Sequence, residues 1–137
     1  MIWYRRILRG IDFKIHNSKS AKERNVEKMK ILITGANGML AKSVRKRLAN
    51  GNELVCTDVN ELDITNEEAV NALVATIEKE VGVIDILVNN AGIIKRIPMC
   101  DMTAAEFRQV IDVDLNAPFI VSKAVIPSMI KKGHGKI

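Results

Sequence analysis

The segment KILITGANGMLAKSVRKRLAN constrains the fold of this chain most strongly, since an apolar strand pattern leads through a glycine turn into a helix pattern. Gly35, Gly38 and Ala41 have the spacing G-x-x-G-x-x-A. Gly35 permits a tight turn, Gly38 lets the backbone approach a phosphate, and Ala41 allows close packing of helix on strand. The sequence therefore predicts that this turn, with Asn37 and Met39, binds a pyrophosphate at a helix N-terminus. A purely structural turn is the alternative.

Strand and helix patterns alternate through residues 29–137. The segments ELVCT, VIDILVNNAG and the final GHGKI have the pattern of strands, and helical periodicity follows the glycine turn and the positions Thr65 and Thr103. The residues expected to face inward are Met39, Leu40, Val44 and Leu48 in the first helix and Val70, Leu73, Val74 and Ile77 in the second. This order predicts the fold class α/β, a partial Rossmann-like doubly wound parallel sheet.

The starts of the later helices are marked by capping boxes. Thr65 with Glu68, and Thr103 with Glu106, have the spacing at which each side chain bonds a free backbone N–H of the helix start. The long helix from Thr103 is expected to reach about residue 132, whole or as two helices joined at Pro118. The segment LDI follows the second strand too closely for a parallel crossover, so we expect a short extended piece rather than a strand.

Asp58 ends the second predicted strand, twenty residues after Gly38. An acidic side chain at that place can bond both ribose hydroxyls of NAD and repel the 2′-phosphate of NADP. The expected cofactor is therefore NAD or NADP, with NAD favoured by Asp58. Basic residues on the first helix keep NADP open, and an ordinary strand-end aspartate is the alternative.

Charge and composition disfavour several other classes of protein. Residues 1–30 carry nine Lys or Arg and three Asp or Glu, whereas the remainder carries twelve and thirteen. The basic excess thus belongs to a leader, residues 1–28, which we expect to be disordered; a targeting or nucleic-acid-binding arm is the alternative. No nucleic-acid surface or membrane span is predicted for the domain 29–137. Cys56 and Cys100 fit no metal-ligand spacing and are expected to be reduced thiols of a cytoplasmic protein.

The motifs TGANGML and NNAG together resemble the short-chain dehydrogenase/reductase superfamily over residues 29–137. Residues 66–137, which include VIDILVNNAGIIKRIPM, are similar to gluconate 5-dehydrogenases. Residues 29–70, which include the compressed segment DVNELDIT, resemble dTDP-4-dehydrorhamnose reductases. The two resemblances meet in the helix after Thr65, and this predicts a fused or recombined gene or an assembly artefact.

The resemblance implies the remaining parts of a nicotinamide dinucleotide site. Asp63 would meet the adenine amino group, and Ile64 would lie against the adenine ring. Asn89, Ala91 and Gly92, at the carboxyl end of the third strand, would line the ribose of the cofactor and stabilise the sheet. Such a position is a switch point at which open α/β sheets bind ligands.

The catalytic residues that the resemblance implies are mostly without a match. Asn116, in DLNAPF, would be the active-site asparagine that holds a water in the proton relay. The family's catalytic Ser and Tyr-x-x-x-Lys are not found, because the one tyrosine is Tyr4 in the leader. We therefore expect a C-terminally truncated chain that retains the cofactor-binding part of an oxidoreductase.

The parent reaction implied by the resemblance is the interconversion of gluconate and 5-keto-gluconate, or of a similar alcohol and ketone pair of a sugar acid. A sugar nucleotide reductase of the rhamnose pathway, or an inactive nucleotide-binding or dimerisation module, is the alternative. Helix 104–132 resembles a helix that the family uses for subunit contact, and this implies a homo-oligomer.

Overall fold

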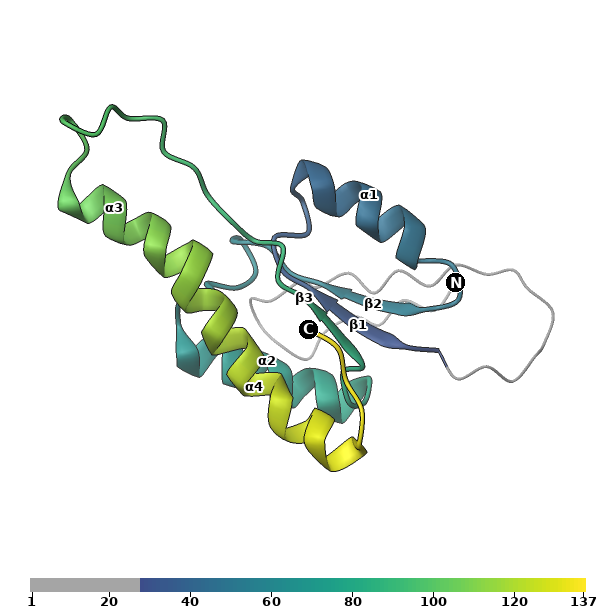
Figure 1. The fold of residues 1–137 in the computed structure, drawn as a ribbon. Helices are drawn as coiled ribbons and strands as arrows, with labels where there is room; N and C mark the ends of the chain where they lie inside the picture. Colours follow the sequence, from purple (N-terminus) through teal and green to yellow (C-terminus); the bar gives the residue numbers. More distant parts are fainter. Residues whose placement is uncertain (1–27) are drawn as a thin grey trace.

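The computed structural model describes residues 28–137 and contains a three-stranded parallel sheet (Figure 1). The strands are β1 (Lys30–Ile33), β2 (Glu53–Cys56) and β3 (Ile86–Val88), and their order is β2-β1-β3. The central residue Leu32 is aligned with Val55 on one side and Leu87 on the other. The predicted α/β fold with a partial, Rossmann-like parallel sheet is confirmed. Apart from Lys28, the predicted leader lies outside the described residues.

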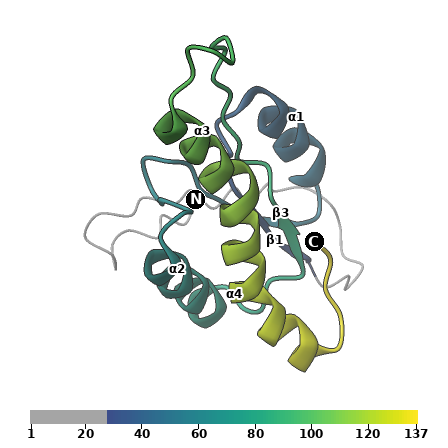
Figure 2. The same ribbon diagram turned by 60° about the vertical axis from the view of Figure 1, so that its left-hand side comes forward.

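Helices cover both faces of the sheet (Figures 1 and 2). The helix α1 (Met39–Leu48) packs on one face, while α2 (Glu67–Glu80) and α4 (Ala117–Lys132) pack on the other. Strand residues alternate between the two faces, so each face has its own apolar core. The α1 side is built on Ile31, Ile33, Leu54 and Cys56, and the α2–α4 side on Leu32, Val55, Val70, Leu73, Val74, Ile77, Val121, Val125 and Met129.

The inward face of α1 differs from the prediction. Met39 and Leu40 are 90% and 70% exposed, whereas Ala41 is fully buried and Val44 and Leu48 pack on the core. The buried stripe therefore has the spacing i, i+3, i+7 from Ala41, and the expectation for Met39 and Leu40 is wrong. The first turn of α1 follows the glycine turn at the carboxyl edge of the sheet, and its two large apolar side chains face away from the core.

The predicted capping boxes have different outcomes. The box of α3 (Ala104–Ile111) is confirmed: the Thr103 hydroxyl accepts the N–H of Glu106 at 3.2 Å, and the Glu106 carboxylate accepts the N–H of Thr103 at 2.9 Å. The box at Thr65 is wrong, because the N-cap of α2 is Asn66, whose side-chain oxygen accepts the N–H of Ala69 at 2.9 Å.

The long C-terminal helix runs without a break through α3, a π-helical turn η1 (Asp112–Asn116) and α4. Pro118 lies in the first turn of α4, so the helix is not divided there as one prediction had it. Residues Ala117, Val121, Val125 and Met129 form its buried row. The sequence analysis predicts no membrane span for this domain. The run Ala104–Lys132 is nevertheless long and apolar enough to cross a membrane. Its packing on α2 and the sheet favours a core helix instead.

The final residues of the chain begin to extend the sheet beside β3, as predicted for GHGKI. Lys136 forms a parallel bridge with Ile86, with hydrogen bonds from the Leu87 N–H to the Lys136 carbonyl and from the Lys136 N–H to the Asp85 carbonyl. The segment LDI forms no strand, which is also as predicted.

Asp85 joins three segments at the amino edge of the sheet. Its buried carboxylate accepts the N–H of Lys30 at 2.8 Å and a proton of the Lys132 ammonium at 2.7 Å, and His134 Nδ1 lies 3.8 Å away. Burial opposes ionisation of this carboxyl group, but the hydrogen bonds from Lys132 and Lys30 and the positive charges of their side chains outweigh it. The pKa of Asp85 is therefore below its usual value.

Candidate functional site

Three segments meet at the carboxyl edge of the sheet, one after each strand. They are the glycine turn 34–38 after β1, the segment 57–64 after β2 and the turn 89–92 after β3. Because β1 lies between β2 and β3, the glycine turn is the central one of the three. Ligands of open α/β sheets bind at such an edge.

The glycine turn has almost no space for side chains. Gly35 has a positive φ of 60°, and a Cβ atom built on it would lie 2.6 Å from the Cα of Ala91. A Cβ on Gly38 would lie 3.2 Å from the Gly35 carbonyl oxygen. Glycine is thus required at position 35 by backbone conformation and packing, a side chain at position 38 would be tight, and Ala91 is brought directly against Gly35.

A partly buried hydrogen-bond network fixes the turn after β3 to the turn after β1. The Thr34 hydroxyl accepts the N–H groups of Asn90 and Ala91, each at 3.2 Å. The Asn90 amide donates to the carbonyl oxygens of Thr34 and Gly35 at 3.2 and 2.9 Å. The sequence-based site did not include Thr34, and it gave Asn90 no role. The hydrogen bonds between Thr34 and Asn90 can be predicted only once β1 and β3 are known to be adjacent strands.

The N-terminus of α1 is suited to an anion. Its N-cap is Gly38, no described side chain caps it, and its first turn holds no acidic residue. The N–H groups of that turn and the positive end of the helix dipole are therefore available to a phosphate. Basic residues lie in the last turn, and one of them, Arg45, donates to the Ala36 carbonyl at 3.1 Å and so supports the turn from behind. Asn37 and Met39 are exposed at this place, as a ligand contact requires.

Asp58 connects the second segment to the glycine turn. Its Oδ2 accepts the N–H of Asn37 at 2.7 Å, and its Oδ1 accepts the N–H of Val59 at 2.7 Å. Each carboxylate oxygen has a second lone pair, so Asp58 can still accept hydrogen bonds from ribose hydroxyls. The structure thus brings Asp58 and the turn together, as the sequence predicted.

Asp63 and Ile64 lie further along the same segment. The Thr65 hydroxyl and the Thr65 N–H both donate to Asp63 Oδ1, at 2.7 and 2.9 Å, and these bonds lower the pKa of Asp63. The carboxylate is exposed and ionised, which suits an acceptor for an amino group. Ile64 is half-buried and packs against the α2–α4 core.

Asn89 and Gly92 are held by the long C-terminal helix. The Asn89 amide donates to the Ser122 hydroxyl at 3.1 Å, which ties the end of β3 to α4. A Cβ on Gly92 would lie 3.5 Å from the carboxylate of Asp114 in η1. The helix therefore packs closely on the turn 89–92.

Within η1, Asp114 rather than Asn116 contacts this turn. Asp114 Oδ1 accepts the N–H of Ile93 at 2.9 Å, whereas the Asn116 amide donates to Asp112 Oδ1 at 2.8 Å inside the helix. Single π-helical turns are frequent at functional sites. Sequence reasoning missed Asp114. The usable signal was the pattern DVD, which places two acidic residues in a mostly apolar helix.

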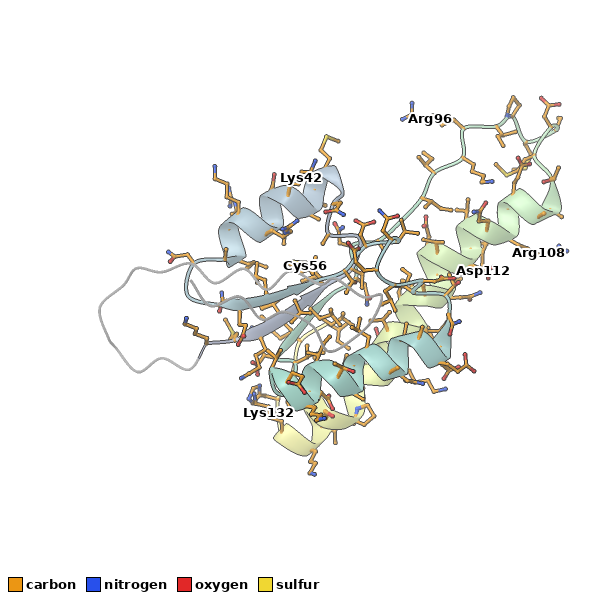
Figure 3. The ribbon with its side chains drawn as sticks, turned by 180° about the vertical axis from the view of Figure 1, so that it is seen from behind. Lys42, Cys56, Arg96, Arg108, Asp112 and Lys132 are labelled. Carbon is orange, nitrogen blue, oxygen red and sulfur yellow. The ribbon has the colours of Figure 1, made fainter. Side chains whose placement is uncertain are left out.

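The segment 93–103 extends away from the sheet beyond the site. Figure 3 shows Arg96 on this segment, far from Lys132 at the other end of the molecule. The figure also shows Cys56 within the sheet, where burial raises the pKa of its thiol. Cys56 and Cys100 are both free, which confirms the prediction of unpaired thiols.

Comparison with known proteins adds to this geometry. The family model described as short chain dehydrogenase matches residues 19–137. A 2-dehydro-3-deoxy-D-gluconate 5-dehydrogenase of Formosa agariphila is 52% identical over 75 residues, which are 55% of this chain and 28% of that protein. The chain thus spans less than a third of the length of this curated relative.

Two solved structures are similar over most of the described chain. The 2-keto-3-deoxy-D-gluconate dehydrogenase of Streptococcus agalactiae has a TM-score of 0.65 and 46% identity, covering 80% of this chain and 49% of that one. A gluconate 5-dehydrogenase of Burkholderia cenocepacia, solved with NADP and tartrate, has a TM-score of 0.72 and 27% identity, covering 82% and 52%. These likenesses confirm the predicted resemblance to gluconate 5-dehydrogenases. The resemblance of residues 29–70 to dTDP-4-dehydrorhamnose reductases stays a prediction.

Proposed function

This chain belongs to the short-chain dehydrogenase family, and we propose that residues 29–137 are the cofactor-binding part of an NAD(P)-dependent oxidoreductase. One observation carries the proposal: the uncapped N-terminus of α1, Asp58 and the turn 89–92 meet at one edge of the sheet. The resulting surface offers N–H donors to a pyrophosphate and carboxylate acceptors to an adenosine.

The residues have distinct tasks in this proposal. Gly35, Asn37, Gly38 and Met39 form the surface that binds the pyrophosphate: the two glycines leave no obstructing side chain, Asn37 is exposed beside them, and the free N–H groups of the first helical turn begin at Met39. Asp58 accepts hydrogen bonds from the adenosine ribose, and this favours NAD over NADP. Asp63 and Ile64 receive the adenine, while Asn89, Ala91 and Gly92 line the ribose of the cofactor. A bound nicotinamide dinucleotide supplies or accepts the hydride.

The proposed reaction interconverts an alcohol and a ketone of a sugar acid. Its support is the names of the relatives, which act on gluconate or on 2-keto-3-deoxy-gluconate. Asn116 is proposed to hold a water of the proton relay, and Asp112 fixes its amide for that purpose. We assign no proton donor within residues 29–137, where the sequence has no tyrosine. A sugar nucleotide reductase is less favoured, since its support is confined to the resemblance of residues 29–70.

Fluorescence titration with NADH and NADPH tests the cofactor site. Binding with a dissociation constant below the millimolar range is the expected result, and the absence of binding at millimolar cofactor would remove the proposal. An assay of gluconate-dependent reduction of NAD or NADP by the same chain tests whether residues 1–137 also catalyse the reaction.

A second proposed function is self-association through the long helix. The exposed residues Phe107, Leu115, Phe119, Ile126 and Ile130 all lie on α3–η1–α4, and an exposed apolar stripe of this kind marks a contact surface. A homo-oligomer would cover it, and an inactive subunit could still take part in such an assembly. With its two free thiols, the protein is proposed to reside in the cytoplasm.

A further inference from the structure

The hydroxyl of Thr57 is buried at the candidate site without a hydrogen bond. Thr57 directly follows β2 and is 1% exposed. Its backbone is fully used, because its N–H donates to Ile33 and its carbonyl accepts from Ala36, each at 3.0 Å. Its side-chain oxygen, by contrast, has no partner within the part of the chain that the structure describes. The great majority of buried side-chain polar atoms are bonded, so this exception requires an explanation.

The place of Thr57 in the sheet suggests that explanation. Strand residues two apart share a face, so Thr57 lies on the same face as Val55. That face is covered by the core that contains Leu62 and against which Ile64 packs. Thr57 therefore lies on the face of the sheet against which Leu62 and Ile64, the neighbours of Asp63, pack, and its own sequence neighbour Asp58 bonds the glycine turn. Both neighbours belong to the adenosine half of the proposed cofactor site.

We propose that Thr57 is a further positioning residue of the cofactor site, whose hydroxyl gains its hydrogen bond when the adenosine half of the dinucleotide binds. The partner of the Thr57 hydroxyl in this bond is the adenine itself, or a water that the bound adenine encloses against segment 62–64. The inference rests on the proposed function. Because this hydroxyl is already out of bulk solvent, the new bond forms without the loss of a protein–water bond, and its contribution to affinity is larger than that of an exposed hydroxyl.

The test compares Thr57→Val with Thr57→Ser in the full chain. Valine has nearly the shape of threonine but no hydroxyl, so Thr57→Val should raise the melting temperature of the free protein by roughly 2–5 °C. The same variant should bind NADH and ADP-ribose roughly 3- to 10-fold more weakly. Thr57→Ser keeps the hydroxyl and should bind both ligands like the wild type. Thr76→Val is the matched control, because the Thr76 hydroxyl bonds only within α2, to Ala72.

The outcomes separate this inference from the proposed function. If the wild type fails to bind NADH and ADP-ribose, the proposed function is wrong. If the wild type binds and Thr57→Val binds equally well, the hydroxyl has no role in the site and only the inference is overturned. A loss of NADH affinity with unchanged ADP-ribose affinity also overturns it, since the adenosine half is then unaffected. Equal losses in Thr57→Val and Thr57→Ser would indicate altered packing rather than a lost hydrogen bond.

Discussion

Single residues in this structure often hold two segments at once, and Asp58 is the clearest case. It accepts two backbone N–H groups and is proposed to accept ribose hydroxyls as well. Asp58→Ala is therefore expected to weaken NADH binding about tenfold and NADPH binding less, because the mutation also removes the repulsion of a 2′-phosphate. The ratio of the two dissociation constants, from fluorescence titration, measures this effect.

A control for Asp58 is available on the segment 93–103. Asp101→Ala removes an exposed carboxylate outside the site and should leave both affinities unchanged. Equal losses for NADH and NADPH in Asp58→Ala would mean that the side chain acts only through its bond to Asn37.

At Gly35, both the backbone conformation and the packing of neighbouring atoms require glycine. An alanine there would need φ near +60° and would place its Cβ 2.6 Å from the Cα of Ala91. Gly35→Ala is expected to lower the free energy of unfolding by roughly 2 kcal/mol or more. Gly51→Ala is a matched control, since Gly51 also has a positive φ but a Cβ added to it would meet no atom within 4 Å. Chemical denaturation of both variants isolates the contribution of the contact with Ala91, and equal losses would refute it.

At the scale of elements, the start of α2 distinguishes two candidate caps. Asn66 bonds the N–H of Ala69, whereas Thr65 bonds Asp63 on the surface. Asn66→Ala should therefore reduce the free energy of unfolding by about 1 kcal/mol, and Thr65→Ala by only a few tenths. Urea denaturation measures both values. A larger loss for Thr65→Ala would restore Thr65 as the cap.

At the amino edge of the sheet, the charged side chain of Asp85 joins two elements. Asp85 bonds β1 and α4, and its pKa is lower in the folded chain than in the unfolded one. The stability that this carboxylate contributes is fully present above the unfolded pKa of about 3.9 and is lost as the pH falls through the lower, folded pKa. Asp85→Asn should destabilise the protein at pH 7 by about 1–3 kcal/mol and by less below pH 4.

Denaturation curves between pH 3 and pH 7 measure the difference between wild type and Asp85→Asn. Glu67→Gln is a suitable comparison, because Glu67 also bonds a lysine, Lys123, but at the surface, where an ion pair contributes little. A difference for Asp85→Asn that stays constant with pH would show that ionisation is not involved.

At the scale of the whole molecule, the apolar stripe on the long helix is the surface through which we propose that the protein associates. Phe119 is 67% exposed at the centre of the stripe. Phe119→Glu places a charge in the proposed contact and should shift the protein to a monomer in sedimentation velocity experiments. Val59→Glu alters an apolar residue that is even more exposed, on another segment, and should not change the oligomeric state. A monomeric wild type would refute the contact.

The sequence predicts this architecture well where the signal is local. The parallel α/β fold, the glycine turn and the position of Asp58 at the end of the second strand follow from periodicity and spacing. The misses depend on tertiary contacts. Leu40 has the right spacing for a core residue but no strand beneath it, Asn66 replaces Thr65 because Asp63 competes for the threonine, and Asp114 gains its role from packing against a distant turn. No local pattern indicates the π-helical turn, since the turn depends on how the surfaces of α3 and α4 are aligned along one continuous helix.

The π-helical turn changes how the residues on either side of it are aligned around the helix axis. Phe107 and Phe119 are twelve positions apart, which in an ordinary α-helix would separate them by about 120° around the axis. The wider turn η1 absorbs most of that angle, at about 4.4 residues per turn, and so both rings lie within about 30° of one another. The long helix is thus continuous, and η1 accommodates one additional residue with little rotation of the segment beyond it. Removal of a single residue from η1 would convert it to an ordinary α-helical turn, in which four residues at about 100° each replace five at about 82° each, so that the rows at Phe119 and Val121 would stay on their surfaces to within about 10°.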